Sequence, residues 1–186
     1  MEDTTISIIG IMVAAILMFI VPFVLIADRT DDIAQLSVST ATAEFTNNVI
    51  KTGVITAEDY NNYLMTLAST GNTYDVDIKL EILDENTAKK TTMDSSTPVI
   101  GENSYYSIFT TQIEDMLNKS DISDDGRPNN TGKVILKEGD GISVTAKNSS
   151  RTLSQAIKNI YYNVKGEELH IILGTSSGTI SMNGAT

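Results

Sequence analysis

The stretch GIMVAAILMFIVPFVLIADRTDD, Gly10–Asp32, is an almost unbroken apolar run that contains one proline and ends abruptly in acidic residues. From Ile8 to Ala27 no side chain is charged or strongly polar. At about 1.5 Å of rise per residue, twenty helical residues cover roughly 30 Å, the thickness of the hydrocarbon core of a bilayer. Residues 1–27 are therefore predicted to form a transmembrane segment.

The energetics of this run favour membrane insertion. About thirteen large apolar residues, at roughly −0.3 to −0.6 kcal/mol each, contribute about −4 to −8 kcal/mol. Pro22 would cost about 3 kcal/mol in the interior of a soluble helix, but less in a membrane, where the freed backbone groups find new partners. We therefore expect Pro22 to be a tolerated bend in a helix that stays in the membrane.

A cleaved secretory signal is the alternative interpretation of this run. Such a signal needs a basic first region and a small-residue cleavage site. Residues 1–3 contain no Lys or Arg, and Ala27-Asp28-Arg29 is a poor small-x-small site, so a retained anchor is favoured. Arg29 is the only basic residue among the first fifty, and acidic residues surround it, so charge leaves the topology open.

The helix is predicted to continue beyond the apolar run. No Pro or Gly occurs from Asp28 to Lys51, and Gly53 then supplies a stop signal after a basic residue. Apolar residues recur with helical spacing at Ile33, Leu36, Val38, Ala41, Phe45 and Val49. We expect one helix over Thr5–Thr52, with residues 28–53 an amphipathic continuation of the anchor and no flexible linker between them.

Residues 54–186 are predicted to form the head. A short helix follows Thr56, which with Asp59 resembles a capping box, and Gly71 ends it. Its expected buried face is Tyr60, Tyr63, Leu64 and Leu67. The sequence TYDVDIKLEIL then alternates between apolar and charged residues, which predicts a half-buried strand with one solvated face.

The remaining pattern predicts further elements of an α+β head. Loops are expected at 84–103 and 120–132, a helix at 104–119, and a hairpin over 133–147 with its turn at 139–141. Thr152 and Gln155 form a capping box for a helix that Gly166 ends, and residues 168–184 are predicted to form one strand or a short hairpin. The predicted fold class is a long N-terminal helix carrying a small antiparallel-sheet head.

The composition narrows the class of partner. The formal charge is −11, almost all of it beyond the anchor, which argues against binding to nucleic acid or to anionic lipid headgroups. A soluble, self-repelling head surface is the expected meaning of this charge. The chain has no cysteine, so disulfides and thiolate metal sites are excluded.

Candidate catalytic groups are few. His170 is the only histidine and lies in an apolar strand pattern, GTSSG at 174–178 is interpreted as a turn, and the carboxylates fall on solvated faces. Asp121, Ser123 and Asp125 before Gly126 resemble the first half of a calcium loop, but Gly132 stands where the closing glutamate belongs. A solvated loop is favoured over bound calcium, and no other cofactor, substrate or enzymatic activity is predicted.

Two small residues in the anchor favour close helix packing. Gly10 and Ala14 are four residues apart on one helix face, the small-xxx-small spacing found at helix interfaces in membranes. Membrane lipid and a neighbouring helix are therefore the expected partners of this segment.

The segments ATAEFTNNVIKTGVITAEDYNNYLMTLASTGNTYDVDI (41–78) and GISVTAKNSSRTLSQAIKNIYYNV (141–164) resemble pilin-like proteins of Gram-positive bacteria. More broadly the chain resembles type IV pilins and pseudopilins, and more narrowly the TadE-type minor pilins of tight-adherence systems. The resemblance implies a single-pass subunit with its head outside the cell, packing through its N-terminal helix with copies of itself or other pilin-like subunits. Glu2 and Pro22 are implied assembly residues, because the family uses a carboxylate near the helix start and a proline in the membrane segment.

Two functions remain open from the sequence. The first is a structural, non-enzymatic subunit of a pilus or of a pilus-assembly or secretion system at the cell surface. The second is a membrane-tethered extracytoplasmic binding or sensory module, which a flexible linker after the anchor would favour.

Overall fold

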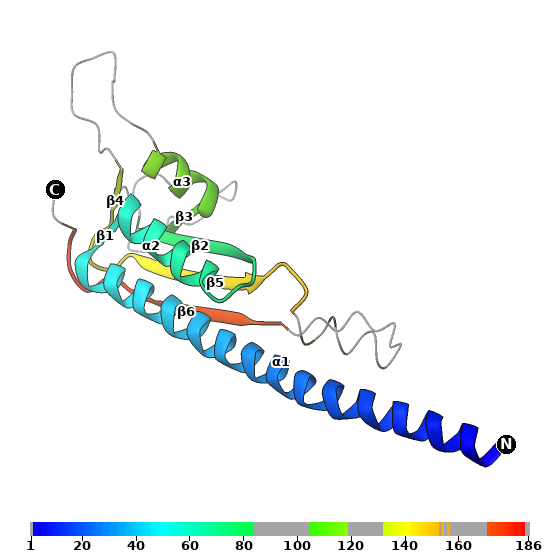
Figure 1. Ribbon diagram of the computed structural model, residues 1–186. Coiled ribbons are helices and arrows are strands. Elements are labelled where there is room, and N and C mark those ends of the chain that lie inside the picture. The colour runs from blue at the N-terminus through cyan, green and yellow to red at the C-terminus, as the bar shows by residue number, and fades with distance from the viewer. Residues whose placement is uncertain are drawn as a thin grey trace, which may run out of the picture.

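The computed structural model describes residues 2–83, 105–118, 132–152, 154, 156 and 171–184 of the chain. A single helix, α1 (Glu2–Thr52), runs without a break through Pro22 and extends far beyond the head that its C-terminal half carries (Figure 1). The predicted helix over Thr5–Thr52 is therefore confirmed. So is the fold class, a long apolar N-terminal helix with an α+β head built on antiparallel sheets.

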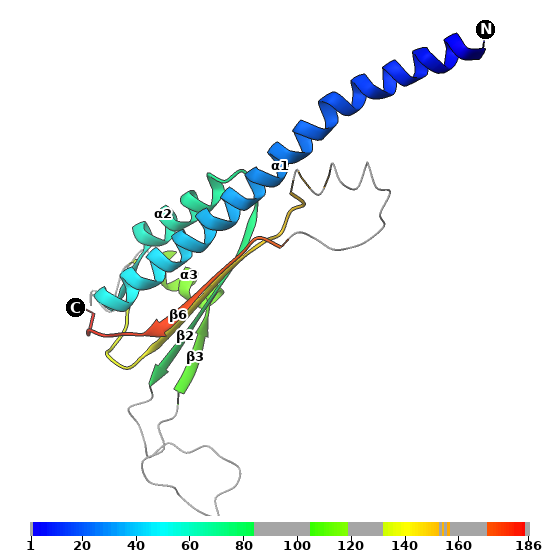
Figure 2. The same ribbon diagram turned by 90° about the horizontal axis from the view of Figure 1, so that it is seen from below.

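The described part of the head contains two antiparallel sheets and two further helices. The larger sheet has the order β3-β2-β5-β6, and the smaller one pairs β1 with β4. Helices α1 and α2 lie side by side over one face of the larger sheet (Figure 2). The bounds are β1 Val54–Thr56, α2 Ala57–Ala68, β2 Tyr74–Leu83, β3 Tyr105–Phe109, α3 Thr110–Asn118, β4 Lys133–Ile135, β5 Gly141–Asn148 and β6 Leu173–Thr179.

Strand β2 has the predicted alternation. Ile78 and Leu80 are fully buried and pair in register with Val144 and Ile142 of β5. Their charged neighbours in β2 are more exposed and lie on the opposite face of the sheet. An antiparallel sheet that packs on helices through one face shows this pattern.

Helix α2 begins at its predicted cap, with a different bond pattern. The hydroxyl of Thr56 accepts a hydrogen bond from the backbone N–H of Asp59 at 3.0 Å and donates to the carboxylate of Asp59 at 2.6 Å. In a full capping box the second side chain would instead reach the backbone N–H of the first residue. Three of the four predicted core residues of α2 are buried, and Leu64 packs against the core from a partly exposed position.

The predicted helix over 104–119 is wrong in its first third. Residues 105–109 form strand β3, which pairs with β2 through the register Leu80↔Ile108, and α3 begins only at Thr110. The hydroxyl of Thr110 accepts a hydrogen bond from the backbone N–H of Ile78 at 2.7 Å, which fixes the transition. The apolar residues fit a helical spacing locally, but the edge of β2 offers backbone partners that favour the extended form.

The predicted hairpin over 133–147 is also wrong. A turn does occur at 137–140, but β4 pairs with β1, and β5 pairs with β2 and β6. The Asp140 carboxylate is buried in the turn and accepts hydrogen bonds from the backbone N–H groups of Lys137 and Leu83, at 2.8 and 3.0 Å. This side chain connects the turn to the end of β2 and so directs the two flanking strands into different sheets.

The C-terminal segment forms one strand, β6, rather than a hairpin. Beyond it, the backbone N–H of Ser181 donates to the carbonyl of Ile50 at 3.0 Å, and that of Gly184 donates to Leu136 at 2.9 Å. These bonds hold the segment after β6 against the end of α1. The predicted loops at 84–103 and 120–132 lie outside the described residues, except for Gly132.

The helix predicted after Thr152 is described only at its start. Ser154 and Ala156 are helical, and the N–H of Ala156 donates to the carbonyl of Thr152 at 3.0 Å. Gln155 and Gly166, which complete the predicted helix signals, lie outside the described residues.

Candidate membrane-anchoring and assembly surface

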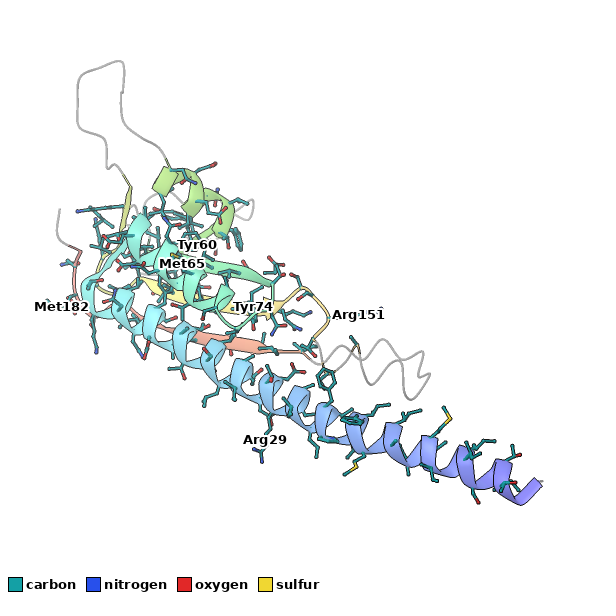
Figure 3. The ribbon with its side chains drawn as sticks, viewed as in Figure 1. Arg29, Tyr60, Met65, Tyr74, Arg151 and Met182 are labelled. Carbon is teal, nitrogen blue, oxygen red and sulfur yellow. The ribbon has the colours of Figure 1, made fainter. Side chains whose placement is uncertain are left out.

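The first half of α1 exposes an apolar surface on every side. Met18 and Phe19 are 78% and 77% exposed, and no residue in the most apolar window of 18 residues is buried against the rest of the described chain. Figure 3 shows side chains projecting on all sides of this half of α1, which extends beyond the head. Within the described part of the chain, α1 is the helix that by length and composition could cross a membrane.

A surface of this kind is unfavourable in water. Burying apolar area contributes roughly 25 cal/mol per Å², and exposed apolar patches above a few hundred Å² mark surfaces that something else covers. Apart from the hydrogen bond that Pro22 cannot donate, the helical backbone of this segment bonds within itself, which is the condition for entering hydrocarbon. The segment is therefore physically suited to lipid or to the apolar faces of other helices.

The four sequence-predicted packing residues all lie in this half of α1. Gly10 and Ala14 are exposed, and a side-chain carbon built on Gly10 would have no atom within 4 Å. Pro22 is exposed within the continuous helix. Glu2 is the first residue of α1, but the position of its side chain lies outside the described part. The Gly10–Ala14 face is thus open for a neighbour to approach closely.

Two carboxylates of α1, just after the apolar run, contact the head. Asp31, only 4% exposed, accepts a hydrogen bond from the hydroxyl of Thr152 at 2.6 Å. One turn earlier, Asp28 accepts a short hydrogen bond from the hydroxyl of Ser154. Both acceptors therefore lie at the N-terminal turn of the helical segment after Thr152, where negative charge is favourable.

Asp31 and Asp28 were not predicted as contact residues. The expectation that carboxylates lie on solvated faces is wrong for Asp31 and for Asp140, which are both buried. The sequence signal was the capping residue Thr152, whose partner 121 residues away could not be identified without the tertiary structure.

The second half of α1 packs onto the sheet with small and hydroxylic residues. Thr42 and Thr46 are fully buried, and each hydroxyl donates to the carbonyl four residues earlier in the helix, at 2.7 and 2.8 Å. This bonding removes the cost of an unsatisfied buried hydroxyl. The buried stripe consists of Ala27, Asp31, Ala34, Val38, Ala41, Thr42, Phe45, Thr46 and Val49.

Two residues of the predicted apolar stripe are on the opposite side. Ile33 and Leu36 are each 69% exposed and point away from the head. The helical spacing of the other four predicted positions is confirmed. Ile33 and Leu36 extend the apolar character of the anchor past Ala27 along one face of the helix.

Close approach between α1 and β6 depends on glycine. A side-chain carbon on Gly174 would lie 2.6 Å from the hydroxyl of Thr42 and 2.9 Å from the carbonyl of Val38. A side-chain carbon on Gly178 would lie 2.5 Å from the end of the Ile50 side chain. The GTSSG motif is thus a strand beneath a helix, and its interpretation as a turn is wrong.

A side chain of α1 covers the outer edge of β6 at Leu173. The Gln35 amide donates to the carbonyl of Leu173 at 2.8 Å and accepts from the N–H of the same residue at 2.9 Å. A side-chain amide here takes the place of a neighbouring strand. This pair adds a third point, after Asp31 and Gly174, at which α1 contacts the head.

An open groove of about 220 Å³ separates α1 from α2. At its base the rings of Phe45 and Tyr63 stack with centroids 4.7 Å apart, and the Tyr63 hydroxyl lies 2.9 Å from that of Thr42. Carboxylates and amides form the rim. The lining residues are Ala41, Glu44, Phe45, Asn48, Asp59, Asn62, Tyr63 and Thr66.

The two buried tyrosines of α2 hold their protons tightly. Burial raises the pKa of Tyr60, and so does its hydrogen bond to Glu114, at 2.7 Å. Burial also raises the pKa of Tyr63, against the opposing effect of its bond to Thr42. Both phenols are therefore neutral hydrogen-bonding groups of the core over the physiological range.

The remaining predicted site residues are not placed. Asp121, Ser123 and Asp125 of the possible calcium loop, and His170, lie outside the described residues. Among the residues that are described, no three His, Cys, Asp or Glu side chains gather in a way that could hold a metal ion.

Comparison of the chain with protein-family models, with curated protein sequences and with solved structures found no match.

Proposed function

We propose that this chain is a non-enzymatic, pilin-like subunit, a minor pilin or pseudopilin, of a pilus or of a pilus-assembly or secretion system. In this proposal residues 1–27 anchor it in the cell membrane, the head lies outside the cytoplasm, and α1 packs against α1 of other subunits. The single observation that carries the proposal is the continuity of α1, whose exposed apolar half passes without a break into a half that is buried in the head.

The support for anchoring is the exposed apolar surface itself. The apolar run from Ile8 to Ala27 matches the hydrocarbon thickness of a bilayer. No residue in the most apolar window of α1 is buried within the described chain, which leaves lipid or other helices to cover it. Pro22 lies within this segment and does not interrupt the helix.

The support for an assembly role is the fixed geometry between helix and head. The Asp31–Thr152 contact, the Gln35–Leu173 contact and the close approach at Gly174 hold the sheet in one orientation on α1. A subunit that packs through its helix needs the head at a defined angle, because the helix position then determines the head position. A tethered receptor has no such requirement.

The test compares the full chain with a variant that lacks residues 2–26, both expressed in the native cells. The full chain is expected in the membrane fraction after alkaline carbonate extraction and in sheared surface appendages, and the shortened chain is expected in neither. A variant with Met65→Ser, which changes an exposed apolar residue of α2, controls for general loss of apolar surface. Appendages that form normally without the chain, together with a full chain found only as dispersed monomers, would contradict the proposal.

The groove between α1 and α2 favours a second candidate, a membrane-tethered binding or sensory module. Its rim carries the carboxylates of Glu44 and Asp59, which suit a cationic group such as a basic side chain of a partner. Binding of a lysine-rich peptide to the full chain in detergent, lost in Asp59→Asn, would support this module. Unchanged peptide affinity in that variant, or no binding at all, would count against it.

A further inference from the structure

The groove between α1 and α2 carries polar groups that have no partner within the described chain. The carboxylate of Glu44 and the side-chain amides of Asn48 and Asn62 make no hydrogen bond there. One oxygen of the Asp59 carboxylate accepts a hydrogen bond from the hydroxyl of Thr56 at 2.6 Å, and the other oxygen accepts none from a side chain of the described residues. No Lys or Arg of the described chain forms an ion pair with either carboxylate.

The register between the two helices follows from their contacts. A short connection, residues 53–56, joins α1 to α2, so the helices run in opposite directions side by side (Figure 2). The rings of Phe45 and Tyr63 stack across the groove, and the hydroxyl of Thr42 lies 2.9 Å from that of Tyr63. Position 63 of α2 therefore faces positions 42–45 of α1, and positions nearer the connection face each other one turn further along.

This register gives the groove two polar positions. Glu44 lies across from Asn62, and one turn nearer the connection Asn48 lies across from Asp59. Each position therefore combines a carboxylate of one helix with an amide of the other. Four residues of α1, or about 6 Å of rise, separate the two positions. A ligand that uses both must place two hydrogen-bond donors about 6 Å apart.

The charge of the groove favours cationic groups, and its size favours side chains over a whole small molecule. Carboxylates without a counter-charge bind positively charged donors most strongly. Pockets for drug-sized molecules measure roughly 300–1,000 Å³, whereas this open groove has about 220 Å³. Guanidinium groups suit the groove, because their planar fork of donors can bind a carboxylate and an amide carbonyl together.

The spacing and shape of the groove favour a helical partner. Side chains at positions i and i+4 of a helix lie on one face, with Cβ atoms about 5–6 Å apart. A groove between two helices is also a surface into which a third helix can pack. The base of the groove at Ala41 and Phe45 is apolar, so it can take the methylene stems of the two basic side chains.

This chain does not supply such a helix. The basic residues of α1, Arg29 and Lys51, are many turns apart, and α2 and α3 contain no Lys or Arg. In the whole sequence, two pairs of basic residues have the i, i+4 spacing, at positions 133/137 and 147/151, and each pair begins in a strand. The occupant is therefore a helix of a different protein.

We propose that the groove binds a helix of another protein that presents two arginines at positions i and i+4. One arginine lies at Glu44 with Asn62, and the other lies at Asp59 with Asn48. The inference rests on the second candidate function, the binding module, and it names the partner of that site. It holds whether or not the chain also assembles with other subunits.

Fluorescence anisotropy with the full chain in a nonionic detergent at low salt tests the spacing. Two labelled alanine-rich helical peptides of the same composition are compared, one with its two arginines at i and i+4 and one with them at i and i+2, on different sides of the helix. The first peptide is expected to bind about two- to fivefold more tightly, the difference made by one exposed ion pair. Equal affinities would overturn the proposed spacing.

Glu44→Gln tests the site, because it removes the charge and keeps the shape of a side chain that makes no contact needed for folding. The variant is expected to bind the i, i+4 peptide about two- to fivefold more weakly and to bind the two peptides nearly equally. Glu58→Gln removes an exposed carboxylate of α2 outside the groove, so this control is expected to leave the affinity unchanged. An equal loss in both variants would show general attraction to an acidic head and would overturn the site.

The inference and the function on which it rests fail in different ways. If a lysine-rich peptide binds and Asp59→Asn abolishes that binding, but the two arginine peptides bind equally, the binding module stands and the paired spacing is wrong. If no basic peptide binds the full chain, the module and the inference are both wrong.

Discussion

The two halves of α1 have the same backbone and opposite surroundings. Residues 4–26 expose large apolar side chains on every face, whereas residues 27–52 bury a narrow stripe of mostly small residues under the head. In the described chain, no residue of the most apolar window in the first half is buried. The second half is held against the head by hydrogen bonds and by close contact with glycines of β6.

The difference shows what each environment requires of a helix. Lipid accepts any apolar shape, so bulk and length are sufficient in the first half. A sheet accepts a helix only where both surfaces fit, so the second half places Thr42 opposite Gly174 and satisfies its hydroxyls internally. Of the large apolar residues in the second half, Ile33 and Leu36 point outward, whereas Phe45 is buried and stacks on Tyr63 of α2.

The largest expected effect comes from placing one positive charge in the first half of α1 rather than in the second. Ile16→Arg should weaken membrane insertion by about 3 kcal/mol, because a charged side chain at the centre of a membrane helix is costly. Ile33→Arg makes the same change in the head half and should leave insertion nearly unchanged. Carbonate extraction of membranes measures both. Equal extraction of the two variants would remove the distinction between the halves.

The next effect concerns the fit of α1 on β6. Gly174→Ala is expected to lower the free energy of unfolding by about 2–3 kcal/mol, because the new carbon meets a backbone carbonyl that cannot move alone. Gly178→Ala meets only the flexible end of Ile50 and should cost less than about 1 kcal/mol. Urea unfolding of the full chain in detergent micelles measures the two values. A larger cost at Gly178 would contradict the assigned contact.

A smaller effect is expected at the junction between the halves. Removing either partner of the buried contact, with Asp31→Ala or Thr152→Ala, should reveal a coupling of about 1–2 kcal/mol in a double-mutant cycle. The Asp28–Ser154 contact is only partly buried, so its cycle should give a smaller coupling. Additive single effects at Asp31 and Thr152 would show that the contact does not hold the head on the helix.

The smallest effect appears only in alkali. Tyr60 and Tyr63 have pKa values raised by burial, so the folded head binds their protons more tightly than the unfolded chain does. The stability that follows is complete below pH about 10, the ordinary tyrosine pKa, and is lost as the pH rises above it. The urea midpoint of the full chain should therefore fall above pH about 10, and less steeply in Tyr60→Phe/Tyr63→Phe. Parallel pH profiles for the two chains would contradict this.

Local signals in the sequence predicted the helices and strands that have a long run of apolar residues, a regular alternation or a clear cap. The apolar run, the stop at Gly53, the cap at Thr56 and the alternation in β2 each follow from neighbours close by in the chain. Residues 105–109 were predicted wrongly because their extended form depends on pairing with β2, which is distant in the sequence. The 133–147 hairpin was wrong for a similar reason, since β4 finds its partner in β1.

The sequence likewise predicted one part of the candidate surface and not the other. Its apolar half, with Gly10, Ala14 and Pro22, could be identified from hydropathy alone, because a continuous apolar helix has the same surface wherever it lies. Its attachment to the head could not, since Asp31 and Gly174 act through partners that are far away in the chain.

By itself the sequence determined that a long helix exists, where it ends, and that its first half is apolar on every side, because these properties depend on residue type and local spacing. Only the tertiary structure decided which side of the second half is buried. Helical spacing allowed either Ile33 or Ala34 to face the head. Ala34 is the buried one, because it lies on the same side of α1 as Val38 and Thr42, which Gly174 of β6 approaches closely. The outward positions of Ile33 and Leu36 follow from that packing.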